Sequence, residues 1–241
     1  MSTEQILEIQ DLQVTVRYKA IKHLHLAVYP PEGRVRVSAP LYMSDEAVRL
    51  AVISHLGWIR RQQARFAAQE RQSEREMAHG ESHYVWGRRC RLLIEEQDAP
   101  PQVRLHGGNK LVLQVRPGLP ADKRRALLNA WYRAELKARI PALLEKWQPV
   151  IGVAVAEWGI KRMKTRWGTC NIAEKRIWLN LELAKKSPHC LEYVLVHELV
   201  HLLERHHNER FRALMDQYLP QWQLYRDELN REPLAYEQWE Y

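Results

Sequence analysis

The stretch YVLVHELVHLLERHHNERF, Tyr193 to Phe211, places histidines and acidic residues among apolar residues. Burying a charged carboxylate or an unpaired imidazole costs several kcal/mol, so this mixture needs a reason. Ser187 and Pro188 just before it are residues that favour a helix start. Apolar residues then recur at helical spacing at Leu191, Val194, Leu195, Leu199 and Leu202. The stretch therefore predicts a buried helix that carries a functional site.

His197 and His201 stand four residues apart, so they project from one helix face about one turn apart. That separation lets two imidazoles bind one Zn²⁺ at ~2.0–2.1 Å each. Glu198 lies beside them, where its carboxylate can take a proton from a water whose pKa the zinc has lowered. This HExxH spacing predicts metal-assisted hydrolysis with one Zn²⁺ per chain. The alternative is a pair of core histidines without a metal.

A catalytic zinc usually has three protein ligands and one open position. His206 and His207 are both candidates for the third ligand. His207 is favoured because it follows His197 at the offset found in HExxHxxGxxH enzymes, although Glu204 stands here at the glycine position.

An unbroken helix would place residue 207 about 9 Å along the axis from His201, too far for both to bind one metal. We therefore predict that the helix ends between Leu203 and His207. Asn208 is a favourable N-cap for a following helix.

Four segments together resemble the YgjP-like (WLM/SprT-like) metallopeptidases, a group of zincins: RWGTC, RIWLNLELAKKSP, YVLVHELVHLL and HHNERF. The resemblance extends over about residues 15–230, with SAPLYMSDEAV, GWIRRQQ and VWGRRCRL as weaker matches. It implies His197, His201 and His207 as metal ligands and Glu198 as the catalytic base. Thr169 stands where the family often has Ser.

Zincins can hold an extended peptide by backbone pairing to an edge strand beside the metal. The segment RIWLNLEL is expected to be that edge over 177–183, with an interior strand as the alternative. The expected substrate contacts are Arg166 and Trp167 in the cleft and, on the strand, Ile177, Trp178, Leu179 and Asn180. The alternatives are a core position for Trp167 and a structural ion pair for Arg166.

The rest of the chain predicts an α+β fold. An antiparallel β-rich N-terminal part, with one long helix after Ser44, precedes a mainly helical zincin-like catalytic part with an edge strand beside the HExxH helix. A long helix is expected from Ala121, with a kink or break at Pro141. We place the domain boundary near Gly118, giving regions 1–118 and 119–241, or one continuous family domain over about 15–230. No internal repeat is evident.

The net charge of +8 is uneven: the segment 121–170 holds eleven Lys/Arg against four Asp/Glu. Clustered positive charge can attract nucleic acid or an acidic protein. The leading function is a zinc-dependent peptidase acting on a peptide or protein. The alternatives are a DNA-associated SprT-like protease acting on DNA-bound proteins, and a non-catalytic binding protein stabilised by metal.

Three cysteines without a CxxC pair favour a reducing compartment. No run reaches the roughly 18 apolar residues of a membrane span, and the first residues do not form a secretory signal. A cytoplasmic protein without membrane contact is expected. The sequence predicts no oligomeric state.

Overall fold

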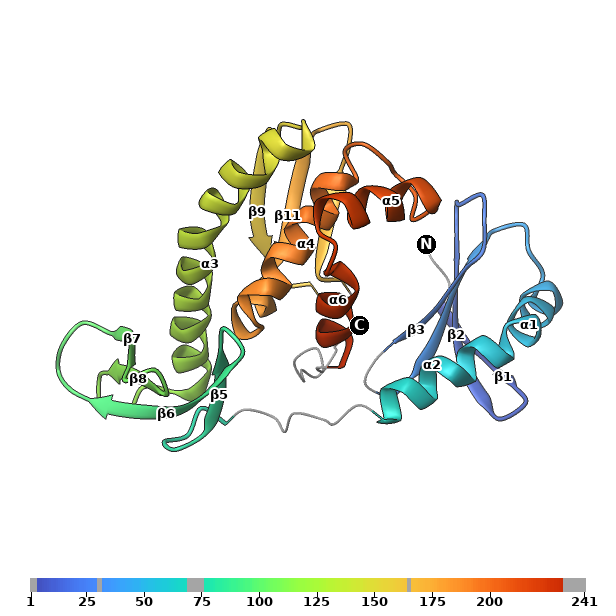
Figure 1. The fold of residues 1–241 in the computed structure, drawn as a ribbon. Helices are drawn as coiled ribbons and strands as arrows, with labels where there is room; N and C mark the ends of the chain where they lie inside the picture. Colours follow the sequence, from blue (N-terminus) through green and yellow to red (C-terminus); the bar gives the residue numbers. More distant parts are fainter. Residues whose placement is uncertain (1–3, 30–31, 69–75, 164–165, 232–241) are drawn as a thin grey trace. The chain divides into compact units, whose positions relative to one another are not determined.

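A computed structural model describes residues 4–29, 32–68, 76–163 and 166–231 of the 241-residue chain (Figure 1). The chain forms two compact units, residues 1–72 and 73–241. Each unit has its own hydrophobic core, and the two cores share no residue. None of the helices in the described part combines the length and hydropathy of a membrane span.

The N-terminal unit is a four-stranded sheet covered by two helices. Its strands lie in the order β1-β2-β4-β3 and are β1 (Glu4–Ile9), β2 (Leu12–Lys19), β3 (His25–Tyr29) and β4 (Arg34–Pro40). Alternate residues of these strands form the core with α1 (Asp45–Ser54) and α2 (Leu56–Ala68). The Ser44 hydroxyl caps α1 by accepting from the Ala47 N–H at 3.2 Å. One long helix was predicted here, but the helix is interrupted at His55.

The second unit begins with another four-stranded sheet. Its strands are β5 (Ser82–Val85), β6 (Arg88–Glu96), β7 (Gln102–His106) and β8 (Lys110–Val115), in the order β5-β6-β8-β7. The order and directions repeat those of the first sheet: two antiparallel pairs flank one parallel pair, β2–β4 or β6–β8. The sheets are therefore mixed rather than purely antiparallel, and a strand arrangement occurs twice where no repeat was evident.

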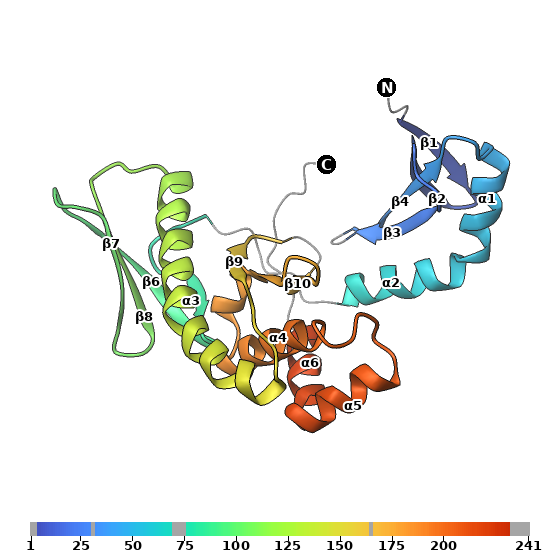
Figure 2. The same ribbon diagram turned by 90° about the horizontal axis from the view of Figure 1, so that it is seen from above.

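The helix α3 (Ala121–Ile151) follows this sheet and continues through Pro141, where a kink or break was expected. Figures 1 and 2 both show α3 beside the sheet and beside α4 (Pro188–Val200). One core runs from Leu92 in the sheet through Leu136 to Leu195. Because residues 82–115 share this core with α3 and α4, the boundary between the two compact units lies near residue 72 rather than near Gly118.

A third sheet has the order β10-β11-β9, from β9 (Glu157–Lys161), β10 (Gly168–Asn171) and β11 (Arg176–Asn180). The prediction that 177–183 is the edge strand is wrong, because β11 pairs with both neighbours. The chain then leaves the sheet as a 3₁₀ helix over Leu181–Lys185. The edge strand beside α4 is β10. The last helices of the described part are α5 (Glu209–Tyr218) and α6 (Trp222–Arg231).

Candidate metal centre

The helix α4 begins as predicted, with Ser187 as N-cap and Pro188 in its first turn. It ends at Val200, and the chain turns before α5 begins. The Asn208 side chain caps α5 by accepting from the Phe211 N–H at 3.0 Å. The helix ends before His207, but at Val200 rather than between Leu203 and His207 as predicted, and the turn brings His207 back toward α4.

Three imidazole nitrogens converge at this turn. Nε2 of His207 lies 3.0 Å from Nε2 of His197 and 3.1 Å from Nε2 of His201. A neutral imidazole has one N–H donor, and three Nε2 atoms facing each other cannot all be satisfied by hydrogen bonds among themselves. A shared transition metal satisfies them together, and imidazole suits zinc. The residues present therefore fit a metal ion.

The tautomer of His201 and the charges of the His197 and His201 rings also fit a metal. Nδ1 of His201 lies 3.1 Å from the Glu204 carbonyl, and a proton donated there leaves Nε2 free to bind. Burial lowers the pKa of His197 to about 3, and the neighbouring His201 and His207 act in the same direction. Burial also lowers the pKa of His201. The lowered pKa of these two half-buried rings favours the neutral form, which a metal ligand must have.

Phe211 lies against all three ligand rings, with ring centroids 4.7 to 4.9 Å away. The other candidate, His206, is exposed and lies outside the group of histidines that could hold a metal. Its backbone N–H donates to the Glu204 carboxylate at 3.1 Å instead. The structure thus brings together His197, His201 and His207.

Glu198 is buried beside these histidines, with 5% of its surface exposed. Burial raises the pKa of its carboxyl to about 8, against the opposing charge of Arg166. The backbone of β10 lies directly on this carboxyl: a Cβ added to Gly168 would stand 2.5 Å from Oε1 of Glu198. Glycine at 168 therefore gives the strand its close approach to Glu198.

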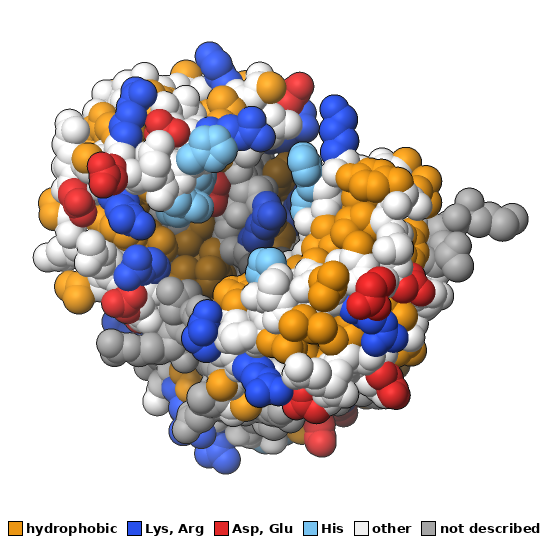
Figure 3. Space-filling model, turned by 90° about the vertical axis from the view of Figure 1, so that its right-hand side faces the viewer, with side chains coloured by type: hydrophobic (Ala, Val, Ile, Leu, Met, Phe, Trp, Pro, Cys, Tyr) orange, Lys and Arg blue, Asp and Glu red, His pale blue; other side chains and the backbone are white. Residues whose placement is uncertain are grey.

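A cleft of about 1350 Å³ opens over the histidines. Residues 168–173, which include β10, form part of its lining together with Arg166 and Trp167, and Trp167 also packs against the core. Other lining residues were not predicted from the sequence, among them Tyr193, Arg205, Arg226 and Leu229. Tyr193 could have been found, since it precedes His197 by one helical turn. Figure 3 shows histidine side chains at the surface beside Lys and Arg side chains.

The four residues predicted on β11 do not line the cleft. Ile177 and Leu179 are fully buried in the core. The Trp178 ring covers Gly159 of β9, where an added Cβ would lie 2.2 Å from it. These residues were predicted to contact substrate because β11 was expected to be an edge strand. As the central strand, β11 has no free edge for a peptide.

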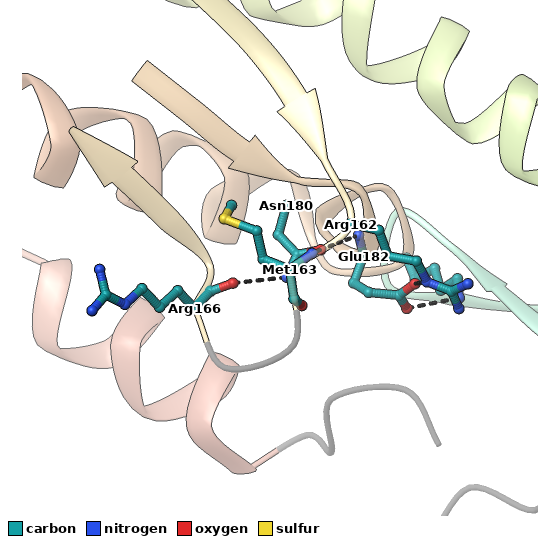
Figure 4. Close-up of polar contacts among 6 residues, drawn as sticks. Arg162, Met163, Arg166, Asn180 and Glu182 are labelled. Carbon is teal, nitrogen blue, oxygen red and sulfur yellow. Dashed lines mark hydrogen bonds and ion pairs between the residues drawn. The ribbon is translucent and has the colours of Figure 1, made fainter. Parts of the chain in front are cut away.

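The fourth residue, Asn180, holds the segment that enters β10 (Figure 4). Its Nδ2 donates to the carbonyls of Met163, at 2.8 Å, and Arg166, at 2.7 Å. Its Oδ1 accepts from the Glu182 N–H at 3.2 Å, and its backbone N–H donates to the Trp167 carbonyl at 2.9 Å. Asn180 thus fixes the backbone on both sides of residues 164–165, which lie outside the described residues.

Comparison with known proteins adds a family to this geometry. The family described as "YgjP-like, metallopeptidase domain" matches residues 22–232. A search of curated proteins found no match. Among solved structures, the metallopeptidase zymogen of Pyrococcus abyssi abylysin has 20% identity and a TM-score of 0.35, covering 37% of this chain and 90% of that chain. A score this low carries no argument here. Because the family match spans most of the chain and includes the histidines, Glu198 and β10, the chain belongs to the YgjP-like metallopeptidase family.

Proposed function

We propose that this protein is a zinc-dependent peptidase that holds one Zn²⁺ per chain through Nε2 of His197, His201 and His207. The observation that carries the proposal is the convergence of these three nitrogens beside a buried glutamate. Zinc bound there supplies Lewis acidity, which lowers the pKa of water and polarises a substrate carbonyl.

Glu198 acts as the general base. Burial raises the pKa of the Glu198 carboxyl, whereas the charge of a bound cation would favour the carboxylate form that a base needs. Its carboxylate oxygens take the proton from the attacking water and return it to the nitrogen of the leaving amine. The backbone at Gly168 keeps this carboxylate in one place.

The strand β10 aligns the substrate. It pairs with β11 on one side, while its residues 168–171 line the cleft. An extended peptide can pair with the other side of β10 through backbone hydrogen bonds, which gives alignment without selecting side chains. We therefore propose β10, rather than β11, as the edge strand that pairs with the peptide.

The two alternatives receive less support. Within the basic segment 121–170, several cations have partners inside the fold: Arg133 with the Ile160 carbonyl, Arg139 with Glu135, Lys146 with Glu192 and Arg162 with Glu182. DNA association stays a prediction, checked by salt-dependent binding. A purely structural metal site does not require a buried base such as Glu198.

The test combines metal content with peptide cleavage. We expect about one zinc per chain in wild type, His206→Ala and Glu198→Gln, and loss of zinc in His207→Ala. Glu198→Gln should reduce cleavage about 100-fold or more, since it removes the base and leaves the ligands in place. Wild-type turnover in Glu198→Gln would contradict the assigned base. Zinc bound equally well by His207→Ala would contradict the ligand set.

A further inference from the structure

The charges that line the cleft are strongly unbalanced. Three arginines line it: Arg166 before β10, Arg205 between α4 and α5, and Arg226 on α6. Among the described residues that line the cleft, Glu198 is the only acidic one, and it is buried. A zinc ion would add further positive charge. A cleft lined by charges of one sign raises the local concentration of ligands of the opposite sign.

These guanidinium groups are poorly neutralised by the protein. Within the described part of the chain, neither Arg166 nor Arg205 has an ion pair. Arg226 pairs with its chain neighbour Asp227 at 3.1 Å and lies over the Trp222 ring at 5.0 Å. Glu204, next to Arg205, instead accepts from the His206 N–H. The cleft therefore offers planar, charged donors that suit carboxylates.

The three arginines surround the catalytic face of α4. Burial raises the pKa of Glu198, and the charge of Arg166 opposes that shift. Burial also raises the pKa of Tyr193, which lies five residues before Glu198 on α4, and the charge of Arg226 opposes that shift. Apolar residues such as Val194 and Leu229 line the same cleft. Arginines spaced around an apolar cleft differ from the continuous basic stripe that follows a phosphate backbone.

We propose that the cleft selects substrates that carry carboxylates close to the cleaved bond, with Arg205 and Arg226 as the specificity-determining residues. This inference rests on the proposed peptidase function. The carboxylate can belong to an Asp or Glu side chain or to the C-terminus of the peptide. Arg166 also lines the cleft and can bind a substrate carboxylate. Its charge acts on Glu198 as well, so a substitution of Arg166 would change both substrate binding and the base.

The experiment compares matched internally quenched peptides that differ in Glu or Gln next to the cleaved bond, each with a free or amidated C-terminus. Cleavage is measured as kcat/KM with the zinc-loaded wild type, and binding is measured as Kd with Glu198→Gln. We expect the carboxylate peptides to be favoured about tenfold in both measurements at low salt. The preference should largely disappear in Arg205→Gln/Arg226→Gln.

Arg212→Gln is the matched control, because Arg212 is exposed on α5 and lies outside the cleft lining. It should keep the tenfold preference. If the Glu peptide is preferred over the Gln peptide, the recognised carboxylate belongs to the side chain. If amidation removes the preference, the recognised carboxylate is the C-terminus of the peptide. Both results support the proposal.

Equal Kd values for Glu and Gln peptides, with no effect of amidation, would overturn the proposal. So would a preference that survives in Arg205→Gln/Arg226→Gln, or tighter binding of a single-stranded oligonucleotide that this double variant abolishes. If the acidic peptides bind Glu198→Gln preferentially but wild type cleaves none of the peptides, the carboxylate site stands. The peptidase function would then be the part that fails.

Discussion

Gly168 has no Cβ carbon, and the place where one would stand is close to Glu198. That carbon would lie 2.5 Å from Oε1 and 2.8 Å from Cγ of Glu198. We expect Gly168→Ala to displace the base and to reduce cleavage about 100-fold, since a displacement of about 1 Å can have this effect. Overpacking should also lower stability by about 1–3 kcal/mol. Kinetics, urea denaturation and zinc content measure the three effects, and zinc should be retained.

The control is Gly57→Ala in α2, where an added Cβ would meet only the Arg61 side chain at 3.5 Å. Alanine should be tolerated there and should raise stability by up to about 1 kcal/mol, because it favours the helix. Unchanged kcat and stability in Gly168→Ala would show that β10 does not press on Glu198.

Asn180→Asp is the second test at this scale. The aspartate keeps the shape of the side chain but loses the two donors to the Met163 and Arg166 carbonyls. We expect a loss of about 2–3 kcal/mol at pH 7 in urea denaturation, because buried acceptors are left facing a carboxylate. The loss should shrink at acid pH, where the protonated aspartic acid can donate one bond.

Asn171→Asp is its control, because Asn171 only accepts there, from the Glu174 N–H at 3.2 Å. An aspartate preserves that bond, so stability should stay within about 0.5 kcal/mol. Equal losses in the two variants would mean that the amide donors of Asn180 contribute nothing particular.

Residue spacing alone predicted His197, Glu198 and His201, because the chemistry requires them on one helix face. The family resemblance and the offset favoured His207. Spacing could not predict Arg226, which reaches the cleft from a helix more than twenty residues downstream. It also could not show that Asn180 binds backbone rather than substrate, since that depends on the path of another segment.

Between elements, Glu192 links α4 to α3. Its Oε1 accepts from Nζ of Lys146 at 2.7 Å and from Nε1 of Trp147 at 2.8 Å. Burial raises the pKa of Glu192, but the hydrogen bonds from Lys146 and Trp147 outweigh it and leave the pKa below its ordinary value. A carboxyl with a lowered folded-state pKa stabilises the fold above its unfolded pKa of about 4.3, and that contribution is lost as the pH falls through the folded-state pKa.

We therefore expect Glu192→Gln to cost about 1 kcal/mol at pH 7, and the cost to decline below about pH 4. The exposed lysine keeps the figure small, since solvent screens the pair. Urea denaturation at both pH values measures it. Glu145→Gln on the exposed side of α3 is the matched control and should change stability by less than about 0.5 kcal/mol at pH 7. A stability loss in Glu192→Gln that grows toward acid pH would contradict the lowered pKa of Glu192.

Local signals predicted where the elements start and stop better than how they pair. Ser44, Ser187 and Asn208 each mark an observed helix start. The neighbours of a strand depend on residues far along the chain, so alternation could identify β11 without showing that it is central. The repeated strand order was missed for the same reason, because it lies in the pairing and not in a repeated motif.

On the scale of the whole molecule, metal removal should affect one unit. The ligand helix α4 belongs to the core of residues 73–241, which shares no residue with the N-terminal core. Chelation should lower the melting temperature of that unit alone, by the equivalent of about 4 kcal/mol if zinc exceeds its Kd a thousandfold. Differential scanning calorimetry with and without chelator measures it.

Val37→Ala identifies the other transition, because Val37 is fully buried in the N-terminal core. It should lower that transition and leave the chelator-sensitive one in place. A single transition that shifts with both treatments would mean that the two units unfold together. The boundary expected near Gly118 could not anticipate these units, since composition does not show which core a strand joins.

The separation of the two cores also has a consequence for synthesis on the ribosome. The buried residues of the N-terminal core all lie between Leu7 and Ile59, so this unit has its complete core long before the metal ligands are translated. The second sheet, in contrast, has to wait for α4, whose residues fill the same core. Domains generally fold in the order in which they emerge. The nascent chain should therefore carry a finished N-terminal unit while β5–β8 still expose apolar surface, and that interval is when the protein is most exposed to aggregation.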